Sequence, residues 1–528
     1  MYRLLHDVLR GKAESIPNVV ALRHESGIGL TYAQLDALSV RWANYLTELV
    51  GDGRRKRPYI AVLAPVGPDS VAAILGLLRA GFAYVPLDDR SPSSRLRSVL
   101  EQASIEVLIA HPAMLRDRPE LLGYPALREV VLCAQGEVSG ATAQEKVLAA
   151  STEPPSNRNI LSEDPVYVLY TSGSTGVPKG IMHTHRSACA FVEWMQREFQ
   201  LTSSDVVMSR APWHFDLSVF DVFNTLAAGG TLITYDWTRP RHGDERHRAY
   251  VDLLTEQQAT VLYTTPSTFI ALLQRGGLGK RPTHLRQLMY AGEPFPIAAL
   301  QALRRGCPQA RIANIYGPTE TNIITCHRVD DQDVAAYDAI PLGREVDDVE
   351  IVLVDDTGEL CAPGEIGELW CRGAPVTVGY LGMPEQTAKH LVRSPFHTAP
   401  AWFWRTGDLA VRDADGILHY RGRRDHMVKV NGFRVELGEV EATAASYTGV
   451  EMFTVVAVAS DDSQPSVQLH AFYTSPWNPV PAEALREHLA DKLPQHMVPL
   501  TLRRLDVMPM TSSGKADRTT LTDIVRNG

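Results

Sequence analysis

The stretch YTSGSTGVPKG, residues 170–180, is the part of the chain on which the other predictions depend. It follows the apolar run 166–169, which predicts a buried strand, and it precedes the periodic segment 187–199, which predicts a helix. Its glycines let the backbone approach an anion closely, its hydroxyl and amide groups donate hydrogen bonds, and Lys179 adds positive charge. We therefore expect a phosphate-binding loop at the end of a strand.

The loop differs from a Walker A motif, because Lys179 follows a proline and precedes a glycine. Taken alone, a flexible loop rich in glycine and serine is as often a plain connection as a phosphate site. Residues elsewhere in the chain decide between these two interpretations.

Composition narrows the class of protein. A chain of 528 residues predicts two or more domains, and 45% hydrophobic with 21% charged residues is typical of a soluble globular protein. A net charge of −9 without a long basic run argues against nucleic-acid binding. The six scattered cysteines form no C-x-x-C pair, which favours a reducing cytoplasm over a metal or disulfide framework. We expect no signal peptide and no contact with a membrane, because no apolar run approaches the ~18–20 residues of a membrane span.

Alternating strand and helix patterns fill the region from residue 58 to 320. The predicted strands are 59–63, 107–110, 231–235, 261–265, 287–290 and 311–316. This alternation predicts an α/β fold in which helices cover parallel sheets. Since ligands bind at the carboxyl ends of such strands, the segments after residues 169, 288 and 312 are candidate binding loops.

The pattern changes after residue 340. Short strands at 349–354, 367–371 and 416–420 predict a small antiparallel unit, and the polar run 422–426 predicts a hinge. Strands at 455–459 and 468–473 and a helix at 482–492 then predict an α+β domain. We expect a large N-terminal domain, residues 1–424, and a small mobile C-terminal domain, residues 425–528.

Seven motifs occur in a fixed order along the chain. They are TSGSTGVPKG (171–180), FDLSVFD (215–221), NIYGPTET (314–321), GELWCRG (367–373), WRTGDL (404–409), GRRDHMVKVNGFRVELGEVE (422–441) and TSSGKADR (511–518). Together they resemble the amino-acid adenylation enzymes, which belong to the superfamily of acyl-CoA synthetases and firefly luciferase. The resemblance covers the chain from about Thr31 to Arg518 and implies that a carboxylate attacks the α-phosphate of ATP.

The resemblance implies a nucleotide site built from most of these motifs. The residues matched to the ATP phosphates are Thr171, Ser172, Gly173, Ser174, Thr175, Gly176 and Lys179. Those matched to the adenine pocket are Gly292, Glu293, Asn314, Ile315, Tyr316 and Gly317, with Tyr316 stacked on the base. Asp408 matches the carboxylate that binds the ribose hydroxyls, and Tyr420 and Arg423 match nucleotide contacts beside it.

Three further residues carry the chemistry that the resemblance implies. Glu320 matches the carboxylate that holds Mg²⁺, and Thr319 matches a donor to the α-phosphate. Lys515 would otherwise be a solvated surface charge, but in the family this lysine bridges the substrate carboxylate and ATP. Rotation about Asp425 then withdraws Lys515 and prepares transfer of the acyl group to a thiol.

The predicted substrate is a small amino acid. Asp216 matches the aspartate that pairs with the α-ammonium group, since a buried carboxylate needs a cationic partner. The residues matched to the side-chain pocket are Leu217, Phe220, Thr268, Met289, Ala291, Ile315, Ile323 and Ile324. Their apolar bulk favours L-alanine, then glycine or serine, with L-proline and D-alanine as competitors.

We expect a stand-alone ligase that loads the phosphopantetheine thiol of a separate carrier protein in secondary metabolism, because no carrier domain follows Arg518. Two other interpretations stay open: an acyl-CoA ligase, and a non-catalytic nucleotide-binding relative. A non-catalytic relative is expected to lack Lys515, Glu320 or Asp408. All three are present, so this interpretation ranks last.

Overall fold

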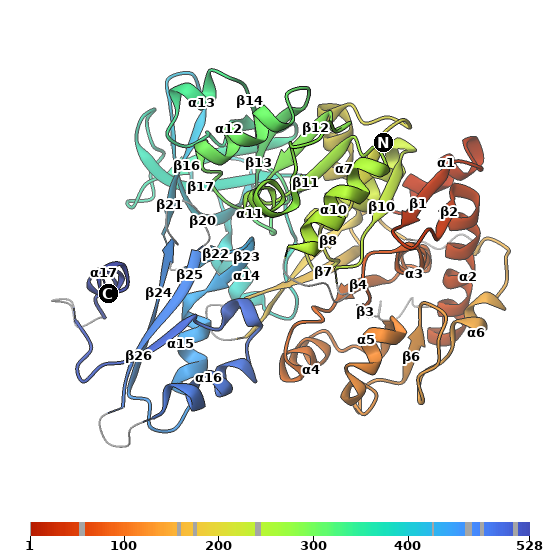
Figure 1. Ribbon diagram of the computed structural model, residues 1–528, viewed down its shortest axis with the longest axis horizontal. Helices are drawn as coiled ribbons and strands as arrows, with labels where there is room; N and C mark the ends of the chain where they lie inside the picture. Colours follow the sequence, from red (N-terminus) through yellow and green to blue (C-terminus); the bar gives the residue numbers. More distant parts are fainter. Residues whose placement is uncertain are drawn as a thin grey trace. The chain divides into compact units, whose positions relative to one another are not determined.

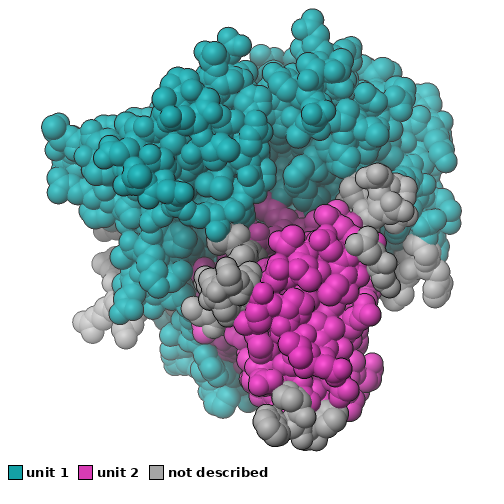
Figure 2. All heavy atoms as spheres, turned by 90° about the vertical axis from the view of Figure 1, so that its left-hand side faces the viewer, with its two compact units in different colours: residues 1–87, 100–169, 180–424 teal, residues 88–99, 170–179, 425–528 magenta. Residues whose placement is uncertain are grey.

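The computed structural model describes residues 2–51, 59–155, 160–172, 177–237, 244–424, 427–459, 467–475, 480–510 and 516–527. The chain divides into two compact units, which are coloured separately in Figure 2. Unit 1 comprises residues 1–87, 100–169 and 180–424, and unit 2 comprises residues 88–99, 170–179 and 425–528. Asp425 lies outside the described residues, so the hinge remains a prediction.

The largest sheet of the described residues has nine strands in the order β15-β14-β13-β12-β11-β9-β10-β1-β2 (Figure 1). Their bounds are β1 Val20–His24, β2 Gly29–Thr31, β9 Val206–Met208, β10 Thr231–Thr234, β11 Val261–Thr264, β12 Gln287–Tyr290, β13 Arg311–Tyr316, β14 Thr325–Val329 and β15 Arg344–Glu345. The run from β13 to β1 is parallel throughout, and only β14, β15 and β2 pair antiparallel. The segments that follow β12 and β13 therefore emerge at the same edge of the sheet.

A second sheet has seven strands in the order β18-β8-β7-β4-β3-β5-β6. Their bounds are β3 Tyr59–Leu63, β4 Ala83–Pro86, β5 Val107–Ala110, β6 Glu129–Leu132, β7 Pro165–Thr171, β8 Lys179–Thr184 and β18 Gly379–Tyr380. Pairs among β3 to β7 are parallel, as predicted. The predicted helix at 187–199 is confirmed as α7 (His185–Phe199), but the loop after β7 first leads into β8, a strand that the sequence did not predict. Strand β8 shows neither an apolar run nor regular alternation, which hides it in the sequence.

The predicted antiparallel unit is confirmed in the third sheet of unit 1. Its path is β16-β17-β20-β19, and β21 also pairs with β20. The bounds are β16 Val349–Val354, β17 Ile366–Gly373, β19 Leu391–Arg393, β20 Trp402–Arg412 and β21 Leu418–Arg423. All of these pairs are antiparallel. This sheet carries Asp408 in β20 and both Tyr420 and Arg423 in β21.

Helices complete unit 1. Besides α7 they are α1 Asp7–Ser15, α2 Tyr32–Val50, α3 Pro68–Arg79, α5 Pro112–Arg116, α6 Gln144–Leu148, α8 Leu217–Val219, α9 Thr225–Ala228, α10 Glu245–Glu256, α11 Pro266–Ala271, α12 Ile297–Gly306, α13 Asp333–Ala336 and α14 Pro384–His390. Helix α2 begins with a capping box, in which Thr31 and Gln34 each bond the backbone N–H of the other. Helix α3 packs closely on α2 because Gly76 has no side chain: a Cβ there would lie 2.2 Å from Cβ of Trp42. Among the described residues, no helix is both long and apolar enough to span a bilayer.

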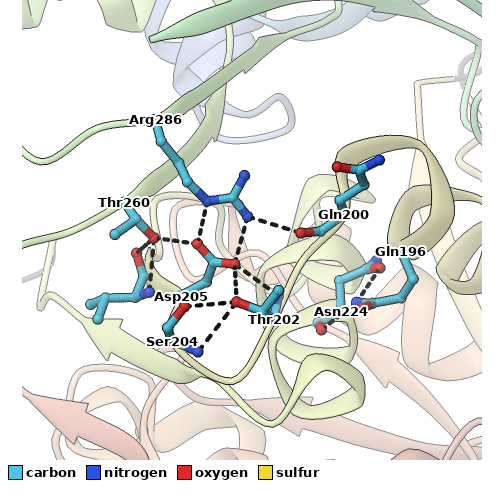
Figure 3. A network of polar contacts seen from close by, with 9 residues as sticks. Gln196, Gln200, Thr202, Ser204, Asp205, Asn224, Thr260 and Arg286 are labelled. Atoms are coloured by element: carbon cyan, nitrogen blue, oxygen red, sulfur yellow. Dashed lines mark hydrogen bonds and ion pairs between the residues drawn. The ribbon is translucent and has the colours of Figure 1, made fainter. Parts of the chain in front are cut away.

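A polar network fixes the amino ends of three strands in the nine-stranded sheet (Figure 3). Asp205, just before β9, accepts hydrogen bonds from Arg286 Nε (2.7 Å) and Thr260 Oγ1 (2.7 Å), which precede β12 and β11. Burial opposes ionisation of Asp205, but the bonds from Arg286 and Thr260 outweigh it and hold its pKa below the usual value. This network lies at the edge opposite to the candidate binding loops, so its role is structural.

Unit 2 is an α+β body, as predicted for the C-terminal region. It contains the hairpin β22 Met427–Val430 and β23 Phe433–Glu436, the sheet β24 Met452–Ala459, β25 Val467–Thr474 and β26 Thr501–Arg504, and the helices α15 Leu437–Ala445, α16 Ala482–Ala490 and α17 Arg518–Asn527. The first part of α4 (Ser93–Gln102) also belongs to it, and Arg95 forms an ion pair of 2.5 Å with the buried Glu439. Unit 2 therefore includes two segments that the sequence assigned to the N-terminal domain.

Candidate active site

The structure describes most of the predicted site residues but not all of them. Gly173, Ser174, Thr175, Gly176 and Lys515 lie outside the described residues. Their assigned roles in binding phosphate and activating the carboxylate remain predictions.

The described ends of the phosphate loop belong to unit 2. Ser172 is buried, where its Oγ donates to the carbonyl of Arg434 (2.8 Å) and accepts from the N–H of Glu436 (3.1 Å). The Thr171 hydroxyl is also buried, but it has no hydrogen-bond partner within the described part of the chain. Lys179 is buried at the start of β8. Ser172 thus anchors this end of the loop to β23.

Residues Thr319 and Glu320 follow β13 and are held by partners from three other segments of unit 1. Thr319 Oγ1 donates to Asp216 Oδ2 (2.8 Å), immediately before α8. Tyr380 OH, in β18, donates to Glu320 Oε1 (2.7 Å), and the N–H of Thr377 donates to the Glu320 carbonyl (2.7 Å). The residue predicted to pair with the substrate ammonium therefore contacts the residue predicted to bind the α-phosphate.

A buried histidine also contacts this segment. His183 Nε2 lies 2.7 Å from the Thr319 carbonyl, and Nδ1 lies 3.2 Å from Asn322 Nδ2. Burial lowers the pKa of His183 to about 4, although the Thr319 hydrogen bond and the charge of Glu320 oppose this shift. The imidazole is therefore neutral at ordinary pH.

The predicted ribose carboxylate lies among other predicted nucleotide contacts. Asp408 Oδ2 accepts from Tyr316 OH (2.6 Å), and Oδ1 accepts from Arg423 Nη1 (2.8 Å), with Tyr420 OH at 3.5 Å. Burial and the neighbouring carboxylate raise the pKa of Tyr316, which therefore stays a neutral donor. A carboxylate offers about four lone-pair positions, so these bonds orient Asp408 without using its whole acceptor capacity.

The predicted adenine residues lie on neighbouring strands. Asn314 in β13 is paired in register with Tyr290 in β12, and its Nδ2 donates to the carbonyl of Pro341 (2.7 Å). Just beyond β12, Gly292 adopts a φ of +95°, which disfavours other residues, and Glu293 Oε2 accepts from the N–H of Ser267 (3.0 Å). The parallel pairing of β12 and β13 therefore brings both halves of the predicted base pocket to one edge.

The predicted side-chain pocket residues are buried in one hydrophobic cluster, except for Thr268, which is half-buried. The members in the cluster are Leu217, Phe220, Met289, Ala291, Ile315, Ile323 and Ile324. Tyr263 in β11 packs edge-on against Phe220 with ring centroids 5.3 Å apart, and it is paired in register with Met289. Tyr263, which the motifs did not identify, is thus a neighbour of two predicted pocket residues, Phe220 and Met289.

Sequence reasoning also missed Tyr380, His183 and Asn322. Each contacts the segment at 319–322 or belongs to it, but the contacting side chains from β8 and β18 are distant in sequence. No local pattern signals such pairing. Asn322 directly follows the motif NIYGPTET and His183 lies just beyond TSGSTGVPKG, but neither motif includes them, and Tyr380 lies further beyond GELWCRG.

Comparison with known proteins establishes the class. A family model described as AMP-binding enzyme matches residues 9–381, so the chain belongs to the AMP-binding enzyme family. It is therefore an enzyme of that family, and the predicted resemblance is confirmed.

Two relatives are similar over nearly their whole length. The chain is 35% identical to the L-proline--[L-prolyl-carrier protein] ligase of Streptomyces coelicolor, covering 92% of this chain and 91% of that protein. It is 32% identical to the protein of the same name in Pseudomonas fluorescens, covering 98% of each. Among solved structures, IdnL1 superposes with a TM-score of 0.79 at 28% identity, covering 96% of this chain and 99% of that one. The fold also matches the adenylation domain AlmE of Vibrio cholerae, with a TM-score of 0.84 at 21% identity, covering 100% of this chain and 98% of that one.

Proposed function

We propose that this chain is an amino acid–carrier protein ligase that activates a small amino acid as its adenylate. The observation that carries the proposal is the hydrogen bond from Thr319 to Asp216, because it places the candidate ammonium partner next to the candidate α-phosphate donor. The full-length similarity to two carrier-protein ligases supports the same reaction.

The reaction has two steps. In the first, a carboxylate oxygen of the amino acid bonds to the α-phosphorus of ATP, the bond from that phosphorus to the β-phosphate bridge breaks, and pyrophosphate leaves. In the second, the carrier thiol sulfur bonds to the acyl carbon, the bond to AMP breaks, and the thiol proton passes to solvent. Both steps build negative charge, which hydrogen-bond donors at the site stabilise. Thr319, whose one hydroxyl proton is donated to Asp216 in the structure, can serve as such a donor once Asp216 pairs with the ammonium group instead.

Glu320 fits the expected magnesium ion. Among the described residues there is no cluster of three or more His, Cys, Asp or Glu side chains suited to a metal. Mg²⁺ is usually held by one or two carboxylates together with substrate phosphates, so the single buried carboxylate of Glu320, oriented by Tyr380, suits it. When bound, the ion supplies positive charge that neutralises phosphate oxygens.

The first substrate to test is L-proline. The volume of Phe220, Met289 and the isoleucines favoured L-alanine in the sequence, but the two full-length relatives are prolyl ligases. The ring of proline is apolar, which suits the buried cluster, and its secondary ammonium can still pair with Asp216. L-alanine, D-alanine, glycine and serine remain alternatives, because small apolar differences supply only about 1–3 kcal/mol of discrimination.

Amino-acid-dependent exchange between ATP and pyrophosphate tests the proposal directly. The assay compares L-proline, both alanine enantiomers, glycine, L-serine and the des-amino acid cyclopentanecarboxylate. We expect the highest rate with L-proline. A maximum at L-alanine would support the proposed ligase function but show that L-alanine, not L-proline, is the substrate. No exchange with any amino acid would contradict the proposed function.

The variant Asp216→Ala tests the role of the ammonium group. Removing one partner of a desolvated charge pair costs about 3 kcal/mol, so exchange with L-proline should fall roughly 100-fold. Exchange with cyclopentanecarboxylate, which lacks the ammonium, should not fall. The control Asp347→Ala removes an exposed carboxylate and should change neither rate. Equal losses for both acids in Asp216→Ala would remove Asp216 from ammonium recognition.

Release of AMP in the presence of a phosphopantetheinylated carrier protein or free coenzyme A distinguishes the two acceptors. We expect the carrier to stimulate release and to retain the aminoacyl group as a thioester. Stimulation by coenzyme A alone would indicate an acyl-CoA ligase.

A further inference from the structure

We propose that His183 is a positioning residue that fixes the Thr319–Glu320 peptide of the adenylation site. This inference rests on the proposed function. Its basis is a set of contacts inside unit 1, and none of the seven motifs contains His183.

His183 lies in β8, one residue before Thr184 caps helix α7, and its side chain is fully buried. Its position is thus set by the sheet and by the start of the helix. Nε2 lies 2.7 Å from the carbonyl oxygen of Thr319, in the segment after β13. The contact therefore ties a strand of the seven-stranded sheet to a loop of the nine-stranded sheet.

The surrounding groups determine the tautomer. A carbonyl only accepts hydrogen bonds, so Nε2 must carry the proton and donate it to Thr319. In the neutral ring, Nδ1 is then an acceptor, with Asn322 Nδ2 at 3.2 Å and Ser187 Oγ at 3.1 Å as its neighbours. The same Asn322 Nδ2 donates to the carbonyl of Pro375 (2.9 Å), and Oδ1 accepts from Tyr167 OH (3.3 Å). The hydrogen bonds are therefore all consistent with one tautomer of His183, protonated at Nε2, and with one orientation of the Asn322 amide.

The backbone at Asn322 explains why the loop requires such support. Asn322 has a φ of +51°, in the left-handed region, which costs free energy that neighbouring contacts must offset. Gly317, at the other end of the loop, lies so close that a Cβ would fall 1.6 Å from the Asn322 carbonyl oxygen. The loop is therefore a tight turn whose two ends are held by backbone contact and by His183.

Fixing the Thr319 carbonyl has a direct consequence for the site. The peptide bond is planar, so a bond to this carbonyl orients the plane that joins Thr319 to Glu320. That plane contains the Cα atoms of both residues, whose side chains contact Asp216 (from Thr319) and Tyr380 (from Glu320). His183 thus orients the candidate α-phosphate donor and the candidate magnesium ligand without touching substrate.

Three variants test this role. His183→Phe keeps the ring volume but removes both nitrogen atoms, and His183→Gln retains one donor and one acceptor. The matched control is His185→Gln, which removes a buried imidazole from the next element, where Nδ1 accepts from the N–H of Leu5 (3.0 Å).

The first readout is amide hydrogen exchange without nucleotide or magnesium. In His183→Phe we expect faster exchange in residues 316–325 and unchanged exchange in residues 286–290. His183→Gln should restore most of the protection, and His185→Gln should leave residues 316–325 as in the wild type.

The second readout is ATP–pyrophosphate exchange with its dependence on magnesium concentration. Loss of groups that orient a metal ligand commonly costs about 10- to 100-fold in activity or metal affinity. We expect His183→Phe to lower the rate and raise the magnesium concentration needed for half-maximal rate, with substantial recovery in His183→Gln.

Unchanged protection of residues 316–325 in His183→Phe would overturn the inference. Faster exchange throughout unit 1, or failure of His183→Gln to restore either readout, would also overturn it by showing a general structural role. These results are separate from the proposed function, because wild-type activity tests that function and the first readout needs no activity.

Discussion

At the residue scale, two aspartates of the motif FDLSVFD have different environments. Asp216 is half-buried and accepts a hydrogen bond from Thr319, whereas Asp221 is fully buried. Asp221 Oδ2 accepts from the N–H groups of Arg210 (3.0 Å) and Ala211 (3.3 Å), while Oδ1 has no partner within the described part of the chain. Burial raises the pKa of Asp221 to about 7, although these hydrogen bonds oppose the shift.

This shift makes stability depend on pH. The folded protein retains the Asp221 proton up to about pH 7, whereas the unfolded chain releases it near the usual value of 3.8. Stability is therefore highest below pH 3.8 with respect to this group and falls as the pH rises to 7. An asparagine at this position does not titrate, so the variant should not lose this stability. We expect the free energy of unfolding of Asp221→Asn, relative to that of the wild type, to rise by about 3 kcal/mol from pH 5 to pH 8.

Urea denaturation of both proteins at pH 5 and pH 8 measures this change. The difference between the two proteins, rather than either free energy alone, isolates Asp221 from the other titrating groups. A difference that is the same at both pH values would show that Asp221 is ionised throughout.

The sequence predicted only part of the candidate site. It assigned roles to Asp216, Glu320 and Asp408, because their motifs are local and ordered, and those roles remain predictions. It passed over Asp221, His183 and Tyr380, because their roles depend on burial and on partners that are distant in the chain. A carboxylate in a motif looks the same in sequence whether it faces substrate or supports a loop.

At the element scale, the polar network of Figure 3 and the candidate site occupy opposite edges of one sheet. Asp205, Thr260 and Arg286 directly precede β9, β11 and β12. The backbone N–H of Thr260 donates to the Val206 carbonyl, and its carbonyl accepts from the N–H of Arg286. The carboxyl ends of β12 and β13 are then available for residues such as Glu293 and Thr319. The network that aligns the strands and the candidate binding residues thus lie at opposite ends of the same strands.

Breaking this network should reduce stability without changing substrate recognition. Arg286→Met leaves the buried Asp205 without its guanidinium partner and should cost about 2 kcal/mol, a value reduced from that of fully buried pairs because Arg286 is partly exposed. The control Arg197→Met breaks an exposed pair with Asp347 and should cost less than about 1 kcal/mol.

Melting temperatures and the KM for the amino acid test this separation. We expect a lower melting temperature and an unchanged KM in Arg286→Met. A large change in KM with an unchanged melting temperature would place the network in the recognition of substrate.

Strand prediction succeeded where the apolar pattern was continuous and failed where it was not. The predicted segments 261–265, 287–290 and 311–316 agree with β11, β12 and β13 to within a residue. Strands β8 and β18 were missed, because β18 has only two residues and β8 begins with lysine and glycine. Tertiary pairing, rather than local preference, forms these two strands.

At the scale of the whole molecule, unit 2 contains segments from three separate parts of the chain. Ser172 bonds the backbone of β23, and Arg95 pairs with Glu439, so residues near 90 and 170 belong to the same unit as the C-terminal region. The predicted domains, 1–424 and 425–528, assign these residues to the N-terminal domain. Composition and periodicity describe only residues that are close in sequence, so they carry no information about such long-range contacts. The phosphate loop thus shares a unit with the chain segment that leads to Lys515.

That segment carries the last prediction. If Lys515 supplies charge only while the adenylate forms, Lys515→Ala should lower ATP–pyrophosphate exchange by about 100-fold or more. Transfer of the acyl group from a supplied aminoacyl-AMP to the carrier thiol should proceed at nearly the wild-type rate, since that step needs no ATP. The control Lys492→Ala removes an exposed lysine that bonds Ser446 in unit 2, and it should affect neither step.

The two half-reactions are measured separately, exchange with labelled pyrophosphate and transfer with purified adenylate. A loss in both would assign Lys515 to binding of the adenylyl group, because that group is common to both steps. Wild-type exchange in Lys515→Ala would remove this lysine from the mechanism. Loss of exchange alone would show that one residue of the C-terminal region serves the first reaction and is dispensable for the second, as a rotating domain requires.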